Sequence, residues 1–223
     1  MDTNSKIKID TFIDLYKIFN ERGFSLYMVG GTVRDYLLHI PLDDMDLVSD
    51  ATPDDIRMFF PHADYSFERF GSVKLIFKNI KFDITTLRKE EDYIDYRHPL
   101  KVIFSKELKE DVIRRDFTIN ALYMDHNLNL IDYVNGEEDI KNKIIRMVGN
   151  PYIRIKEDPL RILRALRFKD LLSFSLDKEL ELAIKENKEL IKKLNKEKIN
   201  QEIRKSSSPE SLKKSLKDLG VLC

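Results

Sequence analysis

The chain has 223 residues, of which 42% are hydrophobic, and its 39 basic residues balance 39 acidic ones to a formal net charge of zero. A chain of this length and hydrophobic content can bury a core in one large or two small domains. A net charge of zero gives no whole-molecule attraction to RNA, so any contact with RNA must come from locally clustered charge. The single cysteine, Cys223, excludes an internal disulfide and argues against a cysteine-based zinc site. No apolar stretch is long enough to span a bilayer, and residues 1–10 lack the apolar core of a secretion signal, so we expect a cytoplasmic protein without membrane contact.

Short strands and helices alternate in the first part of the chain. Apolar alternation marks the strands, a period near 3.6 marks the helices, and Thr52 before a proline is a helix-capping pattern. In chain order we expect a helix over 10–22 ending at Gly23, a strand over 26–29, a helix over 32–38, a strand carrying Asp44 and Asp46, a helix over 53–60, and strands over 72–77 and 80–86.

Asp44 and Asp46 lie in the run LDDMDLV and are the first candidate catalytic residues. In an extended segment residues two apart point to the same face, so both carboxylates project together. Mg²⁺ takes hard oxygen ligands and keeps several waters, so two carboxylates with a nucleotide's phosphates suit it. An isolated pair of this kind in so charged a chain is more often solvated, and the residues before it decide in favour of a metal site.

Those residues are MVGGTVRDYLL, in which Gly30 and Gly31 follow a short strand. Glycines let the backbone approach a phosphate closely, and the first amides of the next helix favour an anion. Arg34 is within reach of a triphosphate, and Asp35 is placed to orient Arg34. A tight turn without ligand is the alternative.

Two further groups extend this pattern. Asp83, in the strand KFDITT, is either a third carboxylate beside the pair or a polar residue on the solvent side. Arg114, Arg115 and Asp116 combine cations with an acceptor, which suits phosphate and a ribose hydroxyl, although surface ion pairs are the ordinary explanation of such a triplet.

Farther along the chain, Asp158, Arg161, Arg164 and Arg167 recur every three residues and predict one basic helical stripe with an acceptor at its start. Cytosine and adenine each present an amino donor beside a ring-nitrogen acceptor, whereas uracil and guanine present a carbonyl beside an N–H. An Asp acceptor next to an Arg donor therefore matches C and A. The alternatives are that Asp158 caps the helix before Pro159 and that the arginines pair with acids.

Taken together, these motifs resemble the class II tRNA nucleotidyltransferases, the CCA-adding enzymes that share a superfamily with bacterial poly(A) polymerases. The resemblance covers residues from about 25 to about 205. His39 stands where the family usually has glycine, and Lys198 replaces an arginine. The matching segments are GGTVRD at 30–35 with Asp44 and Asp46, RRDFTINA at 114–121, the hinge DYVNGEED at 132–139, EDPLRILRALRF at 157–168 and EKINQE at 197–202.

The resemblance implies an α/β head of nucleotidyltransferase type, like the palm of polymerase beta, with a mixed sheet and flanking helices, followed by an all-α neck. We place the catalytic head at 1–140 and the neck, with the nucleobase-reading motif, at 141–223. The implied activity is Mg²⁺-dependent, untemplated addition of C, C and A from CTP and ATP to the tRNA 3′ end. A poly(A) polymerase, a partial A-adding or CC-adding enzyme and a catalytically silent RNA-binding protein remain alternatives.

Three segments carry further expectations. Residues 88–99 (RKEEDYIDYRHP) resemble the family's flexible loop, which favours full CCA addition. Residues 184–205 have the pattern of one lysine-rich amphipathic helix, and 206–211 that of a break before the last helix. Because the sequence stops at Cys223, short of the family's body and tail, we expect weak tRNA binding with a shallow salt dependence.

Overall fold

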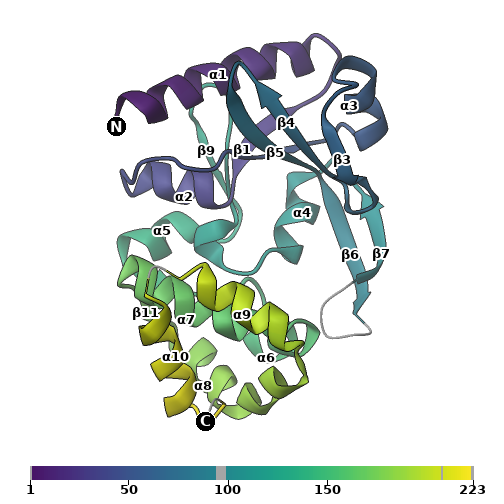
Figure 1. The fold of residues 1–223 in the computed structure, drawn as a ribbon. Coiled ribbons are helices and arrows are strands. Elements are labelled where there is room, and N and C mark those ends of the chain that lie inside the picture. The colour runs from purple at the N-terminus through teal and green to yellow at the C-terminus, as the bar shows by residue number, and fades with distance from the viewer. Residues whose placement is uncertain (1, 94–98, 207, 222–223) are drawn as a thin grey trace. The chain divides into compact units, whose positions relative to one another are not determined.

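The computed structural model describes residues 2–93, 99–206 and 208–221 (Figure 1). The chain forms two compact units. The sheet unit comprises Met1–Glu90, Val102–Arg115 and Ile119–Gly136, and the helical unit comprises Glu91–Lys101, Asp116–Thr118 and Glu137–Cys223. The assignment of a catalytic head to 1–140 and a neck to 141–223 stays a prediction.

A seven-stranded mixed sheet organises the sheet unit, in the order β3, β4, β5, β2, β1, β8, β9. β2 and β5 run parallel, and the other neighbours are antiparallel. The mixed sheet confirms the expected fold class, and the strands expected at 26–29, 72–77 and 80–86 are present. The strands are β1 (Leu26–Val29), β2 (Asp46–Ser49), β3 (Asp64–Phe67), β4 (Ser72–Phe77), β5 (Ile80–Thr86), β8 (Leu122–Met124) and β9 (Leu130–Asp132).

Helices flank this sheet, and α1 and α2 both contact β1. The core contains Phe12, Leu15 and Phe19 of α1, all fully buried, with the inward-facing residues of the strands. The expected helix over 53–60 is confirmed, because Thr52 and Asp55 form a capping box in front of it. The helices are α1 (Thr3–Asn20), α2 (Gly31–Leu37), α3 (Pro53–Phe59), α4 (Leu108–Arg114), α5 (Gly136–Lys141) and the 3-10 turns η1 (Glu68–Phe70) and η2 (Thr118–Asn120).

Two expected boundaries in this unit were wrong. The first helix begins at Thr3 and not at residue 10, because Asp2 caps it by accepting a hydrogen bond from the amide of Ser5 at 3.0 Å. Asp44 lies in a bend before β2, and only Asp46 is in the strand. The alternation nevertheless persists, since Met45 between them is buried while Asp44 is exposed.

The segment expected to be an irregular loop is partly regular. Residues 88–93 form β6 (Arg88–Tyr93), which pairs with β7 (Pro99–Phe104) in a separate two-stranded sheet. Residues 94–98, where the rest of the predicted flexible loop falls, lie outside the described residues.

From residue 137 onward the helical unit confirms the expected all-α character, with one pair of two-residue strands among the described residues. The single helix expected over 184–205 was wrong, because Leu194 is extended and Asn195 caps a new helix by accepting from the amide of Glu197. The elements are β10 (Ile144–Ile145), α6 (Pro151–Glu157), α7 (Leu160–Leu172), β11 (Ser175–Leu176), α8 (Lys178–Asn187), the 3-10 helix η3 (Lys188–Lys193), α9 (Lys196–Arg204) and α10 (Pro209–Asp218).

Candidate active site

Three carboxylates meet at the centre of the sheet. Asp46 on β2 stands directly opposite Asp83 on the parallel strand β5, and Asp44 precedes Asp46 on the same side. The amide of Asp83 donates to the carbonyl of Met45 at 2.9 Å, which fixes the register between the two strands. Asp83, left open by the sequence, therefore lies beside the pair.

The electrostatics of this cluster identify Asp46 as its most perturbed member. Burial, together with the charges of Asp83 and Asp44, raises the pKa of Asp46 to about 6, and Arg115 and Arg34 oppose that rise. Like charges this close disfavour one another's ionisation, and a divalent cation between them removes that penalty. The donor set thus fits a hard divalent metal ion.

The number of carboxylates limits what the protein alone can coordinate. Among the described residues, no group of three or more His, Cys, Asp or Glu side chains has the arrangement of a self-sufficient metal site.

Thr32 of α2 fixes the backbone of the segment that carries Asp44 and Asp46. It lies within the motif GGTVRD, but no role was predicted for it from the sequence. Its buried hydroxyl donates to the carbonyl of Asp44 at 3.2 Å and accepts from the amide of Asp46 at 2.8 Å. One side chain thereby fixes the backbone on both sides of Met45. A threonine at the second helical position after a glycine pair is the only sequence signal.

The glycine pair brings the β1–α2 turn against the carboxylates. Gly30 adopts φ 66° and ψ −130°, a conformation open essentially to glycine alone. A Cβ atom built there would lie 3.6 Å from Asp46 Oδ2 and 3.9 Å from an Nη atom of Arg115. The turn is therefore close to both a carboxylate and a guanidinium group, as a triphosphate site requires.

Arg34 and Asp35 have the relation that the sequence predicted. Arg34 Nε donates to Asp35 Oδ1 at 2.8 Å, and another guanidinium nitrogen donates to Asn120 Oδ1 at 2.7 Å. The Arg34 side chain is buried, and burial raises the pKa of Asp35 while Arg34 opposes the rise. Asn120, in the RRDFTINA motif, is a second positioning residue that sequence reasoning did not assign.

A buried acid anchors Arg115. Asp111 accepts from Arg115 Nε at 3.0 Å and Nη2 at 2.8 Å, and the Tyr123 hydroxyl donates to Asp111 at 2.8 Å. Although burial opposes ionisation, Arg115 and Arg114 hold the pKa of Asp111 well below its usual range. Asp111 was also missed, and its position four residues before Arg115 on a helix was the available signal.

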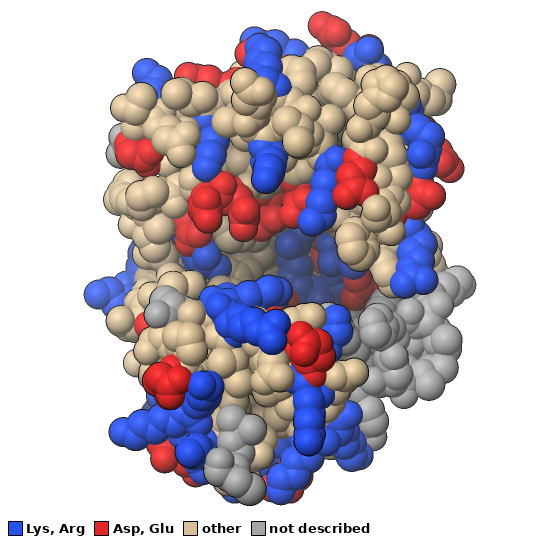
Figure 2. Space-filling model, in the orientation of Figure 1, with Lys and Arg blue, Asp and Glu red and all other residues tan. Residues whose placement is uncertain are grey.

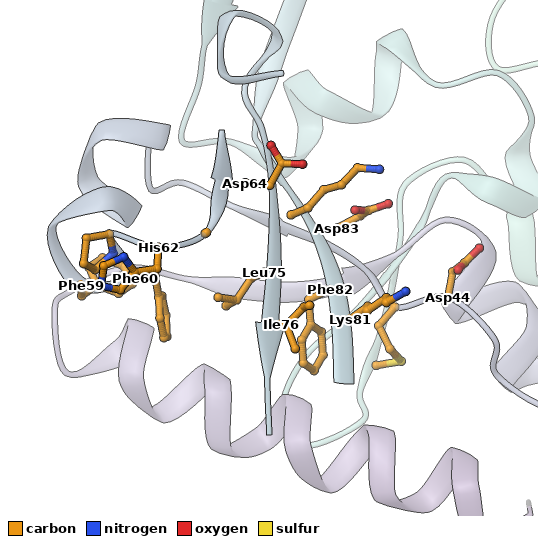
Figure 3. Close-up of a pocket in the computed structure, with 14 residues that line it drawn as sticks. Asp44, Phe59, Phe60, His62, Asp64, Leu75, Ile76, Lys81, Phe82 and Asp83 are labelled. Atoms are coloured by element: carbon orange, nitrogen blue, oxygen red, sulfur yellow. The ribbon is translucent and has the colours of Figure 1, made fainter. Parts of the chain in front are cut away.

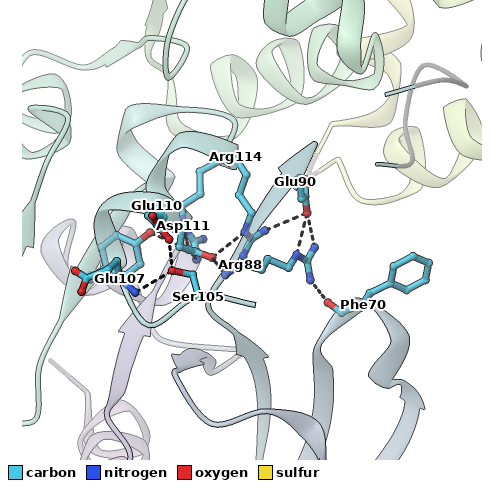
Figure 4. A network of polar contacts seen from close by, with 10 residues as sticks. Phe70, Arg88, Glu90, Ser105, Glu107, Glu110, Asp111 and Arg114 are labelled. Atoms are coloured by element: carbon cyan, nitrogen blue, oxygen red, sulfur yellow. Dashed lines mark hydrogen bonds and ion pairs between the residues drawn. The ribbon is translucent and has the colours of Figure 1, made fainter. Parts of the chain in front are cut away.

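The same carboxylate also joins Arg114 to Arg88 of strand β6 (Figure 4). Its other oxygen accepts from Arg114 Nε at 2.8 Å and from the amide of Arg88 at 3.3 Å. The Arg88 guanidinium donates to Glu90 at 2.7 Å and to the carbonyl of Phe70, and Arg114 lies 3.7 Å from Glu90. Arg114 is therefore part of an internal ion-pair network.

In the helical unit, Asp116 is the central hydrogen-bond acceptor of a second cluster of polar contacts. It accepts from Arg164 Nε at 2.7 Å, and it also accepts from the amide of Phe117 at 2.7 Å. Although burial opposes ionisation, Arg164 holds the pKa of Asp116 below its usual value. The rings of Phe117 and Phe168 meet edge to face at 5.8 Å and connect this cluster to α7.

Asp158 and the other arginines of α7 form separate contacts, as the capping and ion-pair alternatives require. Asp158 accepts from the amide of Leu160 at 3.0 Å. Arg161 donates to the carbonyl of Arg154 at 2.6 Å and to Glu157 at 3.0 Å, and Arg167 pairs with buried Glu202 at 3.1 Å. The basic helical stripe therefore stays a prediction, because Arg161 is buried and the Arg167 side chain is only 11% exposed.

The hinge motif is held by a buried carboxylate. Asp139 accepts from Thr118 Oγ1 at 2.7 Å and pairs with Arg146 at 3.1 Å. These bonds fasten α5 to the segment just after Asp116, all within the helical unit.

Comparisons with known proteins show the family of this chain. The model of the poly(A) polymerase head domain matches residues 26–146. CCA-adding enzymes of Staphylococcus epidermidis and Lactobacillus helveticus are 40% and 42% identical to this chain over 90% and 89% of its length. The chain belongs to the CCA-adding enzyme family.

Solved structures of the family extend the likeness to the fold. The Bacillus stearothermophilus CCA-adding enzyme in complex with CTP has a TM-score of 0.82 and 32% identity, with 95% of this chain and 49% of that one covered. A tRNA nucleotidyltransferase complexed with a primer tRNA and an incoming ATP analogue has a TM-score of 0.77 and 31% identity, with 93% and 60% covered. The chain spans about half the length of the curated CCA-adding enzymes it matches, 50% and 52% for the two above.

The predicted site residues fall into two sets, one in each unit. The sheet unit brings together Asp44, Asp46, Gly30, Gly31, Arg34, Asp35 and Arg115. The helical unit holds Asp116, Asp158, Arg161, Arg164 and Arg167. Among the described residues, no helix combines the length and apolar character needed to cross a bilayer.

Proposed function

We propose that the chain is a metal-dependent nucleotidyltransferase that adds C, C and A to the 3′ end of tRNA, with CTP and ATP as substrates, Mg²⁺ as cofactor and no nucleic-acid template. The observation that carries the proposal is the Asp44, Asp46 and Asp83 cluster beside the Gly30 turn, with Arg34 and Arg115 at its edge. The cytoplasm, where tRNA and nucleotides are found, is the proposed compartment.

In this reaction the 3′ oxygen of the RNA attacks the α-phosphorus of the nucleotide, its proton is lost, and pyrophosphate leaves. Asp44 and Asp46 would hold Mg²⁺, which supplies charge neutralisation at the attacking and leaving oxygens. Gly30 and Gly31 let the triphosphate approach the backbone. Arg34 and Arg115, fixed by Asp35, Asn120 and Asp111, offset the charge on the leaving pyrophosphate.

The base-reading role is proposed for the helical unit. Asp158 and Arg161 would read the edge of C or A, with Asp116, Arg164 and Arg167 as the remaining nucleotide-binding residues. For Asp158 and Arg161 this role requires exchanging the bonds to Leu160 and Glu157 for bonds to a base. Uracil and guanine would then meet like groups, which costs about 1 to 3 kcal/mol per bidentate contact.

The test is extension of tRNA that lacks its 3′ CCA, with each nucleotide supplied separately and product length measured. We expect two additions with CTP alone, three with CTP and ATP, and none after removal of divalent metal. Addition of A without C would support a poly(A) polymerase or A-adding enzyme, and addition that stops after two C would support a CC-adding enzyme. Asp44→Ala serves as the matched inactive control, because Asp44 is exposed and its loss leaves the core intact.

Asp158→Asn separates base reading from helix capping. Asparagine caps about as well as aspartate, but it places an amide donor where the carboxylate accepts. We expect unchanged thermal stability and a shift of preference toward UTP. Unchanged preference for CTP over UTP would leave Asp158 with its capping role alone.

A further inference from the structure

A lysine pair lies on the catalytic face of the β4–β5 hairpin. Residues on these strands alternate, so Lys74 on β4 and Lys81 on β5 are exposed while Leu75 and Phe82 are buried. Lys74 stands directly opposite Asp83, and Lys81 is two residues before Asp83 on its strand. Both amines therefore belong to the same face as the carboxylates.

This face borders a cavity of about 670 Å³ whose lining includes Asp44, Asp83, Lys74, Lys81 and Ile76. Figure 3 shows Asp83, Lys81 and Asp44 projecting from one side of the hairpin. Ile76 is 67% exposed on the same face, directly opposite Lys81. The cavity thus combines two cations and an exposed apolar side chain next to the candidate metal ligands.

The lysines are available for a ligand. Within the part of the chain that the structure describes, Lys78 at the tip of the hairpin pairs with Asp14, whereas neither Lys74 nor Lys81 forms an ion pair. Lys74 lies over the ring of Phe67 at 5.9 Å, and its charge contributes to lowering the pKa of Asp64, after the bonds from Ser66.

The order of strands decides which substrate reaches this face. The triphosphate groups Gly30, Arg34 and Arg115 cluster around β1 and β8, on one side of β2, and β5 and β4 lie on the other. In phosphoryl transfer the attacking and leaving oxygens are roughly in line on opposite sides of the phosphorus. If pyrophosphate leaves on the β1 side of the α-phosphorus, the 3′ hydroxyl of the RNA attacks from the β5 side.

We propose that Lys74 and Lys81 bind backbone phosphates of the last nucleotides of the RNA and so hold its 3′ hydroxyl beside Asp83. The inference rests on the proposed function and names the site for its second substrate. Single-stranded RNA suits the cavity, because lysines track a phosphate backbone and Ile76 offers apolar contact to a base or sugar.

Lys74→Gln and Lys81→Gln, singly and together, test the site, and Lys78→Gln on the same hairpin is the matched control. Each exposed ion pair is worth about a twofold to fivefold change, so we expect the KM for the RNA primer to rise by that factor per lysine while the KM for CTP stays unchanged. RNA binding without nucleotide should lose about 0.7 from its logarithmic salt slope per lysine.

Primers with a neutral methylphosphonate at each of the last three linkages in turn locate the contacts. The effect of Lys81→Gln or Lys74→Gln should disappear when the contacted phosphate is already neutral. Additive effects at all three linkages, or primer KM values equal to those of Lys78→Gln, would overturn the inference even if wild-type protein adds CCA. If wild-type protein adds no nucleotide, the proposed function fails, and the salt slope of RNA binding still decides whether the lysines bind the backbone.

Discussion

At the residue scale, the buried negative charge of Asp46 lowers the stability of the folded protein, and a bound metal ion is expected to remove that loss. Its pKa of about 6 lies above the ordinary 3.8. Below about pH 4 both states of the protein are protonated there, so the group has no effect on stability. Between about pH 4 and pH 6 the unfolded chain ionises first, and stability falls. Above pH 6 the penalty is complete, at up to about 3 kcal/mol.

Asp46→Asn should therefore stabilise the metal-free protein at pH 7.5 by about 1 to 3 kcal/mol and leave it almost unchanged at about pH 3. Added Mg²⁺ should raise the melting temperature of the wild type and not that of the variant, because the ligand is gone. Melting curves with and without chelator measure both effects. Asp43→Asn, a change of the exposed neighbour, is the control, and a destabilised Asp46→Asn at pH 7.5 would contradict the argument.

Changes at and around Asp111 can separate its role in positioning Arg115 from its contribution to stability. Asp111→Asn removes the charge that Arg115 and Arg114 share inside the protein, and loss of one partner of a buried pair costs about 3 to 5 kcal/mol. Tyr123→Phe removes the hydrogen bond that the hydroxyl donates to Asp111 and the one that it accepts from Arg115 Nε, at about 1 kcal/mol each, and keeps the ion pair.

The Tyr123→Phe variant should fold and show a higher KM for CTP with an unchanged KM for the RNA primer, because Arg115 is held less firmly beside the Gly30 turn. Glu110→Gln, next to Asp111 on α4 but paired with Lys89, is the control for denaturant stability and kinetics. Equal effects of Tyr123→Phe on both KM values would assign the tyrosine a purely structural role.

At the element scale, α2 ends in a strained residue. His39 has φ 57°, the amide of His39 donates to the carbonyl of Tyr36, and the amide of Ile40 donates to the carbonyl of Asp35. These are the two bonds of a Schellman motif, whose left-handed residue is usually glycine. The position at which the family usually has glycine is therefore the left-handed position of this turn, and His39 occupies it.

His39→Gly should stabilise the protein by about 1 kcal/mol, since glycine adopts the left-handed conformation without the steric penalty of a Cβ atom. His39→Ala keeps that penalty and should bring no gain, which makes it the matched control. Denaturant midpoints compare the three proteins. A gain in both variants would show that the imidazole, and not the backbone, was unfavourable.

The elements also show how far the sequence was informative. Period and capping predicted β1, β4, β5 and α3, because their apolar faces are local patterns. The break at Leu194 escaped prediction because lysines continue across it without a glycine or proline. Thr32, Asn120 and Asp111 escaped because their roles depend on partners that only the fold brings together, such as Asn120 with Arg34, 86 residues apart.

At the scale of the whole molecule, charge limits RNA binding. The formal net charge is zero, and the face shown in Figure 2 carries both acidic and basic side chains, with a band of acidic ones on the sheet unit. The arginines that the sequence placed in a basic stripe are engaged with Asp116, Glu157 and Glu202. The charges of these arginines are therefore partly neutralised by carboxylates within the protein.

From this distribution we expect weak tRNA binding with few phosphate contacts. With about three phosphate contacts, the logarithm of the affinity falls against the logarithm of the salt concentration with a slope near −2.7, which is about a 40-fold loss between 50 and 200 mM salt. Six to ten contacts would give a loss of about 10³-fold to 10⁵-fold over the same range. Fluorescence anisotropy of labelled tRNA across that range measures the slope. An acceptor-stem minihelix, which lacks the elbow, should bind and be extended almost as well as whole tRNA.

The control for this measurement must change a charge without disturbing the interior. Arg161→Gln fails that requirement because it breaks bonds to Arg154 and Glu157 inside the protein. Lys213→Gln meets it, because its amine pairs with exposed Glu210 on α10, and this variant should leave the slope unchanged. A steep slope that collapses when the elbow is deleted would contradict the observed charge distribution and require a basic surface outside the described residues.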